Sequence, residues 1–213
     1  MNINMDKTDT NKMGEGYVKY TASHTETPAF AAGIPFWKEL DEARTRLYGC
    51  GLIGALQSGI GFGNVSVRVK DGEFLISGTA TGHRRVLGPD GYCMVTAFDI
   101  DKNSVTTSGP LRASSESMSH GAVYCACPSA RAVIHVHSRK IFDGMLGDNC
   151  PHTPVDAPYG TPEMARAIVA CVKAQAAPSG AIVMAGHDEG VIAWGASVQD
   201  AVNLVMELYY KYN

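Results

Sequence analysis

The chain lacks a surplus of charge of either sign. Lysine and arginine number 18 against 21 aspartates and glutamates, a formal net charge of −3 at pH 7. Proteins that bind nucleic acid or anionic membranes through a broad electrostatic field carry a basic surplus. We therefore expect no nucleic-acid or membrane partner. A small anionic substrate would be held by local amides and a few side chains.

Long apolar runs are also missing. No segment approaches the roughly 20 apolar residues of a membrane-spanning helix. Residues 1–32 are polar and threonine-rich, without the apolar centre of a secretory signal. A chain of 213 residues is long enough to bury a hydrophobic core that is stable without disulfide bonds. The six cysteines are therefore interpreted as thiols in a reducing compartment. These absences predict a cytoplasmic protein.

The periodic spacing of apolar residues that predicts helices and strands begins near residue 34. Residues 1–33 show no periodicity and are expected to form a flexible N-terminal arm ahead of one folded domain at 34–213. A helix is expected from Pro35 on, because apolar residues recur there in steps of three and four. Alternation over 64–69, the turn Asp71-Gly72 and the apolar run 74–76 predict a hairpin. Further strands are expected at 93–98, near 105, at 132–137, 182–184 and 191–194.

The remaining helices are predicted from their start signals. Ser114 or Ser115 is expected to cap a helix that ends near Cys127, and Thr161-Pro162 and Ser197 are expected to begin two more. A short helix is expected at 140–146. Strands in hairpins mixed with helices predict an α/β fold: a single-domain three-layer α/β/α sandwich around a mainly antiparallel central sheet.

The most informative local pattern is the apolar run Ala132–His137, which contains His135 and His137. Alternate side chains of a strand share one face, so both imidazoles point the same way and their Cβ atoms lie roughly 6–7 Å apart. Two imidazoles at this spacing can tilt onto one metal ion. The alternative is a half-buried strand whose polar face carries two histidines by chance.

Three other features accompany this strand. Glu116 stands at a predicted helix start, where its negative charge could equally serve only to interact favourably with the helix dipole. His187 lies in a loop between two apolar strands, a place where surface histidines are common. The segment 61–66 is a glycine-rich turn before a strand, and it matches neither a P-loop nor a dinucleotide-binding fingerprint.

Taken in order, these motifs resemble the class II aldolase/adducin family, and the likeness spans about residues 36–212. The motifs that carry it are Gly63-Asn64-Val65-Ser66-Val67-Arg68, Leu75-Ile76-Ser77-Gly78-Thr79, Ser114-Ser115-Glu116, His135-Val136-His137, and His187 ahead of Gly190-Val191-Ile192-Ala193-Trp194-Gly195. The resemblance implies that His135, His137 and His187 bind Zn²⁺, or Mn²⁺ or another divalent ion in its place. It also implies that Glu116 is the catalytic acid/base. The residues that it implies for a phosphate site are Gly63, Asn64, Ser77, Gly78, Ser114 and Ser115.

The chain departs from the family pattern at three places. Asp188 and Glu189 separate His187 from the glycine that usually follows it. Either acid could accept the second N–H of His187, or the two could merely widen the loop. The turn after Ser77 is extended, so Thr81 and Gly82 compete with Ser77 and Gly78 for the phosphate role. The segment between His137 and Thr161 is shorter than in the family's sugar-phosphate aldolases, where it supplies a tyrosine to a neighbouring subunit's site. The candidates for that role here are Tyr159, Tyr209, Tyr210 and Tyr212, with His152 as a further one.

The resemblance implies a zinc-dependent aldolase-type lyase that cleaves a C–C bond of a small ketose phosphate through a metal-stabilised enediolate. It further implies a homotetramer. The alternatives are an epimerase, a dehydratase or a decarboxylase of a sugar phosphate or keto-acid phosphate on the same scaffold. A third class, a non-catalytic interaction module of the adducin type, would have no reason to keep the three histidines together with Glu116.

Overall fold

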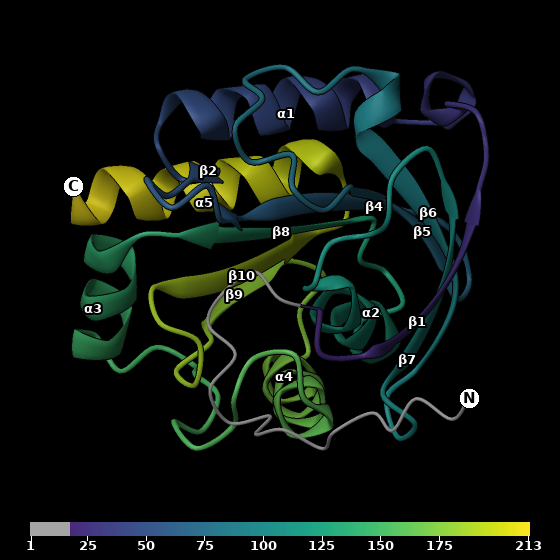
Figure 1. Cartoon of the computed structure of the whole chain (residues 1–213). Coiled ribbons are helices and arrows are strands. Elements are labelled where there is room, and N and C mark those ends of the chain that lie inside the picture. The colour runs from purple at the N-terminus through teal and green to yellow at the C-terminus, as the bar shows by residue number, and fades with distance from the viewer. Residues whose placement is uncertain (1–17) are drawn as a thin grey trace.

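An eight-stranded sheet forms the centre of the protein (Figure 1). The structure is a computed structural model that describes residues 18–213. The strand order is β1-β7-β6-β5-β4-β8-β10-β9, and each pairing is antiparallel except that of β1 with β7. The strands are β1 (Thr21–Glu26), β4 (Asn64–Lys70), β5 (Glu73–Ser77), β6 (Tyr92–Asp99), β7 (Ser104–Gly109), β8 (Ala132–His137), β9 (Gly180–Val183) and β10 (Gly190–Gly195).

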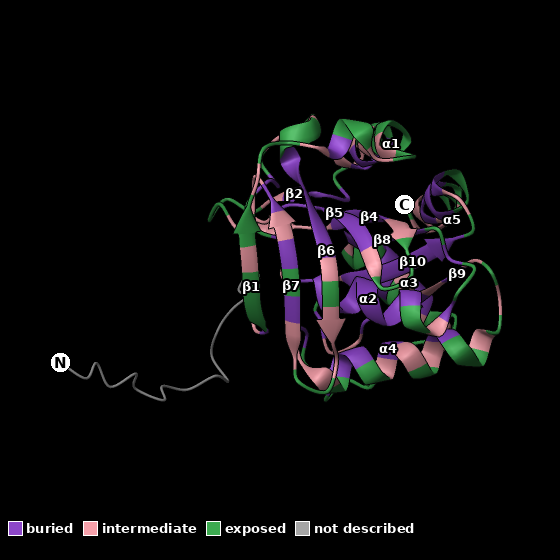
Figure 2. Cartoon of the chain, turned by 90° about the vertical axis from the view of Figure 1, so that its right-hand side faces the viewer, coloured by how far each residue is buried: buried purple, intermediate pink, exposed green. Residues whose placement is uncertain are grey.

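Helices cover both faces of the sheet (Figure 1). One face packs against α1 (Trp37–Gly49), α3 (Arg139–Gly147) and α5 (Val198–Tyr212), and the other against α2 (Ser117–Ala126) and α4 (Pro162–Gln175). Each face has its own apolar cluster. Figure 2 shows that α2 is buried along most of its length, whereas α4 exposes one side. The predicted three-layer sandwich with a mainly antiparallel sheet is confirmed.

Strand β8 divides its side chains between the two faces as the alternation predicts. Ile134 and Val136 are fully buried in the cluster beneath α1 and α5. Val133 belongs to the opposite cluster, so His135 and His137 share its face, the face that carries α2 and α4. The strand therefore turns two imidazoles toward the start of α2.

Helix starts follow the predicted signals in two cases. The hydroxyl of Thr161 accepts from the backbone N–H of Met164, and the hydroxyl of Ser197 accepts from that of Asp200. The prediction for α2 is wrong, because its N-cap residue is Glu116 and no side chain caps it. The hydroxyl of Ser114 instead accepts from the backbone N–H of Glu116, at 3.3 Å.

The segment before α1 differs from the predicted arm. Residues 1–17 of that prediction lie outside the described residues, but Thr21–Glu26 form strand β1, at the edge of the sheet beside β7. Most of β1 is exposed, so it has no buried face that would produce an apolar alternation. Backbone pairing and a contact of His24 Nδ1 with Thr107 Oγ1, at 2.8 Å, attach it to the sheet.

All six cysteines are free thiols, as predicted. Within residues 18–213, no helix combines the length and the apolar character needed to cross a membrane.

Candidate metal centre and binding pocket

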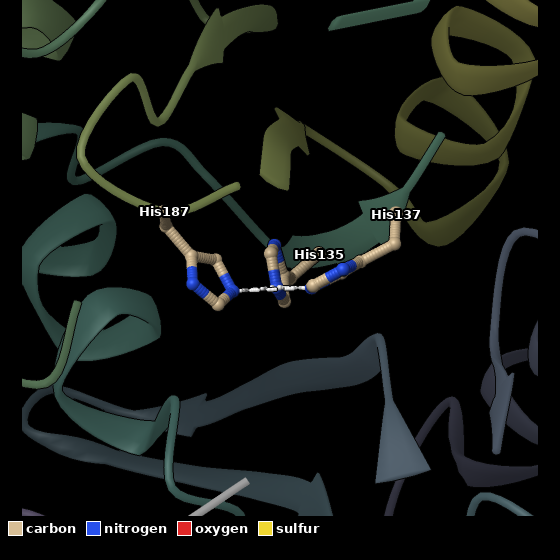
Figure 3. A group of neighbouring side chains, drawn as sticks. All are labelled: His135, His137 and His187. Carbon is tan, nitrogen blue, oxygen red and sulfur yellow. Dashed lines mark hydrogen bonds between the residues drawn. The ribbon is translucent and has the colours of Figure 1, made fainter. Parts of the chain in front are cut away.

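Three histidine side chains from separate positions in the sequence meet at one point (Figure 3). The Nε2 atom of His137 lies 3.0 Å from that of His135 and 3.1 Å from that of His187. The Nε2 atoms of His135 and His187 are 3.3 Å apart. The side chains are buried, with relative exposures of 1%, 7% and 4% in sequence order. The structure thus brings together the three histidines singled out in the sequence.

The register of β8 and β10 places the third histidine. Gly190, the first residue of β10, pairs with His137, and Ile192 pairs with His135. His187 lies in the tight turn just before β10, where its carbonyl accepts from the N–H of Gly190. A Cβ atom at Gly190 would stand 2.5 Å from Cδ2 of His187. Glycine at 190 therefore leaves the space in which the ring of His187 reaches His137.

Burial keeps the three imidazoles neutral. Burial, and then the charge of His187, lower the pKa of His137 to about 3. Burial, and then the charge of Lys19, lower the pKa of His187 to about 4. Burial also holds the pKa of His135 well below its usual range. Nδ1 of His135 lies 3.1 Å from the carbonyl of Val191, so Nδ1–H donates there and Nε2 keeps its lone pair.

This donor set fits a divalent metal ion. Three nitrogen ligands at the usual Zn–N distance of about 2.0–2.1 Å in a tetrahedral site are about 3.3 Å from one another. The observed separations of 3.0, 3.1 and 3.3 Å are close to that value. Three neutral ligands leave one tetrahedral position for another group, which is the pattern of catalytic rather than structural zinc sites.

Glu116 stands beside this cluster on the wall of the same pocket. Its side chain is only 4% exposed. Oε2 accepts a hydrogen bond of 2.7 Å from the hydroxyl of Ser119, one turn along α2. Oε1 is buried and has no hydrogen-bond partner among residues 18–213. A carboxylate with one oxygen held by a hydroxyl and the other without a partner among these residues is suited to exchange a proton with a bound molecule.

Two glycine-rich turns form the rest of the wall. The short strands β2 (Gly54–Ala55) and β3 (Gly61–Phe62) pair beside the turn 78–82. A Cβ atom at Gly82 would lie 2.1 Å from the carbonyl oxygen of Gly54, so the two turns can touch only because residue 82 is a glycine. Asn64 and Ser114 join this wall, with the amide of Asn64 donating to the hydroxyl of Ser114 at 2.9 Å.

Residues 56–211 match the family model of the Class II Aldolase and Adducin N-terminal domain. The match covers well over half of the chain. The chain belongs to this family.

Solved structures share the fold of this class II aldolase-family protein. YgbL from Klebsiella pneumoniae, provisionally described as an aldolase/epimerase/decarboxylase, aligns with a TM-score of 0.60 and 21% identity over 80% of this chain and 83% of that one. L-fuculose-1-phosphate aldolase from Thermus thermophilus aligns with a TM-score of 0.56 and 22% identity over 80% and 87%. A sugar-phosphate aldolase from Thermotoga maritima aligns with a TM-score of 0.55 and 16% identity over 80% and 89%. No curated protein matches the sequence.

Most of the site residues named from the sequence line one pocket of this class II aldolase-family protein. They are Gly63, Asn64, Gly78, Ser114, Ser115, Glu116, His135, His137 and His187. Ser77 is the exception, because its hydroxyl accepts from the backbone N–H of Val65, at 3.2 Å, and does not line the pocket. Thr81 and Gly82, the alternatives to Ser77 and Gly78, do line it.

The two acids after His187 do not face the metal cluster. Asp188 and Glu189 both form ion pairs with Arg139, with N–O distances of 2.5 and 3.4 Å, and their side chains are 79% and 41% exposed. The extra residues therefore lengthen the turn on its outer side. Of the two alternatives for these acids, the widened loop is the one that agrees with these ion pairs.

The sequence did not predict that two aromatic rings pack against the histidines, one against His137 and one against His187. Phe62 packs against His137 with ring centroids 5.5 Å apart, and Tyr159 packs against His187 at 4.7 Å. Tyr159 was a candidate for a neighbouring subunit's site, but in this chain it lines the pocket of its own subunit. His152, Tyr209, Tyr210 and Tyr212 do not line this pocket. Only a contact map could have separated Tyr159 from the other candidates.

Proposed function

We propose that the protein is a zinc-dependent aldolase-type lyase that cleaves a C–C bond of a small ketose phosphate. The observation that carries this proposal is the convergence of three neutral Nε2 atoms next to a buried carboxylate oxygen that has no partner among residues 18–213. Family membership and the fold shared with L-fuculose-1-phosphate aldolase from Thermus thermophilus support it.

His135, His137 and His187 would hold the ion. When bound there, Zn²⁺, or Mn²⁺ in its place, supplies Lewis-acid stabilisation of the negative charge that develops on the substrate oxygens. The burial that keeps these imidazoles neutral supports this role, because a protonated imidazole cannot be a ligand.

Glu116 would move the proton. In the cleavage direction the hydroxyl beside the broken bond loses its proton and becomes the aldehyde, while the carbon on the other side of that bond gains one. The products together contain all atoms of the substrate. We assign to Oε1 of Glu116 the delivery of the proton to that carbon, since Oε2 is engaged by Ser119.

The glycine turns would bind the substrate phosphate. Backbone amides in glycine turns and at a helix start bind phosphate without a basic protein surface. Gly63, Gly78, Ser114 and Ser115 line the pocket together with Asn64, whose Oδ1 is buried without a partner among residues 18–213. We now propose Thr81 and Gly82 in place of Ser77 for this cradle.

The first experiment measures metal and reaction type on the purified full chain. We expect about one zinc or other divalent ion per subunit by elemental analysis. A panel of ketose phosphates and keto-acid phosphates, assayed for aldehyde, for CO₂ and for epimerised sugar, then assigns the reaction. Release of CO₂ or epimerised sugar without aldehyde would replace the lyase by one of its alternatives. A folded protein without metal and without turnover would favour an interaction module.

The second experiment replaces Glu116 with glutamine. E116Q keeps the size of the side chain and removes its ability to exchange a proton, so we expect metal content to be unchanged and kcat to fall about 10²–10⁴-fold. Glu163→Gln, at a 63% exposed glutamate of α4 that does not line the pocket, is the matched control and should behave as wild type. Near-normal turnover of metal-loaded E116Q would exclude the role.

The resemblance also supports a homotetramer, which light scattering of the purified protein would test. The cytoplasmic location stays a prediction.

A further inference from the structure

The described wall of the pocket contains no lysine or arginine. Its acidic side chain is that of Glu116, and the ion proposed at the three histidines would supply positive charge at their end of the pocket only. A phosphorylated substrate would add negative charge to this wall. A cation close to the pocket would therefore contribute to binding more than a cation elsewhere on the surface.

Lys19 places its ammonium group over the ring of Tyr159, a residue that lines this pocket. Nζ lies 4.0 Å from the centroid of the Tyr159 ring, and that ring packs against His187. The aliphatic part of Lys19 lies along Gly160, where an added Cβ atom would meet Lys19 carbons at 3.2 Å. Gly160 has a φ of 73°, so glycine is favoured there both by its backbone and by the close approach of Lys19.

The backbone on both sides of Lys19 is attached to the domain. The amide of Asn103 donates to the carbonyl of Lys19 at 3.1 Å, and the carbonyl of Asn103 accepts from the N–H of Thr21 at 2.8 Å. The hydroxyl of Tyr20 donates to the carbonyl of Ser114 at 2.9 Å, and Tyr20 is only 6% exposed. These contacts connect the segment before β1 to the start of α2, where Glu116 lies.

The charge of Lys19 acts on the pocket. Burial lowers the pKa of Lys19, and the negative charge of Glu116 acts in the opposite direction. Within residues 18–213, Lys19 forms no ion pair with a carboxylate at 4.0 Å or less. No carboxylate in this part of the chain therefore neutralises its positive charge.

We infer that Lys19 is a substrate-binding residue that pairs with an anionic oxygen of the substrate, from a phosphate or a carboxylate group, at the Tyr159 side of the pocket. The inference rests on the proposed function, because it places the substrate beside the three histidines. It adds a recognition residue from outside the matched region 56–211. Tyr159 and Gly160 form the surface that orients its side chain.

Calorimetric titration with three small anions tests this role. Phosphoglycolate carries both groups, glycolate only the carboxylate, and inorganic phosphate only the phosphate. The proteins are the wild-type full chain, K19M, K19R and K70M. Lys70 is the matched control, because it is exposed and lies at the other end of β4 from Asn64, about 20 Å away at 3.3 Å per residue. Metal content and thermal midpoint are measured for each protein.

We expect K19M to weaken binding of phosphoglycolate about tenfold, while K70M binds as wild type and K19R stays within about threefold of it. A parallel loss for inorganic phosphate but not for glycolate identifies the phosphate as the group at Lys19. The reverse pattern identifies the carboxylate.

Equal affinities of K19M and wild type, equal losses in K19M and K70M, or no binding of any probe to the wild type would each overturn the inference. The outcome is separable from that of the proposed function. Metal loss in variants of the three histidines, measured without any anion, tests the metal site alone. A K19M protein that keeps its metal and its thermal midpoint but loses phosphoglycolate tests Lys19 alone.

Discussion

Two groups of buried histidine lie close together on the α2 side of the sheet, and they differ in what their nitrogens meet. In the first, the Nε2 atoms of His135, His137 and His187 lie 3.0–3.3 Å from one another. In the second, Nδ1 of His120 lies 2.7 Å from the hydroxyl of Ser66, which lies 2.8 Å from the hydroxyl of Tyr124. Burial lowers the pKa of His120 well below its usual range, as it does for His135.

The comparison shows that burial and a low pKa do not by themselves identify a metal ligand. Both groups have these properties. The difference is geometric, because three lone pairs that face one point can share an ion, whereas a single imidazole bound to a hydroxyl serves packing and hydrogen bonding. Convergence of donors is the property on which the proposed metal site depends.

The sharpest test of the comparison substitutes one histidine of each group, His137 in the first and His120 in the second. We expect H137Q to lower affinity for Zn²⁺ more than 100-fold, because it removes one of three ligands. H120N should keep the metal content of the wild type and lose thermal stability instead. Competition with a chelator of known affinity gives both values. Equal metal loss in the two variants would mean that the groups do not differ as described.

Acid should destabilise the metal-free protein through the same imidazoles. Burial lowers the pKa of His137 to about 3, whereas in the unfolded chain it is about 6.5. Between these values the unfolded chain binds more protons, so stability present above pH 6.5 is lost as the pH falls. At pH 5 the loss is about 2 kcal/mol for each such imidazole. Urea unfolding of chelator-treated protein at pH 7.5 and 5.0 measures it, and the loss should be smaller in H137Q.

The second group should respond to loss of its central hydroxyl with a fall in stability alone. S66A leaves Nδ1 of His120 and the hydroxyl of Tyr124 without their partner, at a cost of about 1–3 kcal/mol. Y124F removes one hydrogen bond and should cost less. Thermal unfolding gives the difference, and metal content should equal that of the wild type. A loss of metal in S66A would make this network part of the metal site.

The smallest effect is expected at Ser119, which orients Glu116 from one turn along α2. S119A removes the hydrogen bond to Oε2, and we expect kcat to fall about tenfold with metal content unchanged. S119T restores a hydroxyl and should recover most of the activity. Failure of threonine to rescue turnover would indicate that packing at 119, rather than the hydrogen bond, supports Glu116.

Much of the fold was predictable because its signals are local. The alternation over Ala132–His137 places His135 and His137 on one face of β8. The turn Asp71-Gly72 joins β4 to β5, and Thr161 and Ser197 cap α4 and α5 as predicted. These patterns depend on residues a few positions apart, so the chain displays them before it folds.

Strand β1 could not be predicted in this way. Its side chains are mostly exposed, and it joins the sheet through the backbone of β7, about 80 residues later in the chain. Backbone hydrogen bonds do not require apolar side chains, so a pattern of apolar residues cannot predict them. For the same reason nothing in the sequence indicated that Lys19, just before β1, lies over Tyr159.

By itself, the sequence determined that two histidines share one face of a strand, that an acid stands at the start of the following helix, and that the motifs occur in the order of the class II aldolase family. The tertiary structure decided that His187 meets this pair, that Ser77 faces the backbone of Val65, and that Asp188 and Glu189 pair with Arg139 at the surface. The physical reason is distance along the chain. A side chain's face follows from the local period of its strand, whereas its partners across the sheet follow from register and loop path, which depend on the packing of the whole domain.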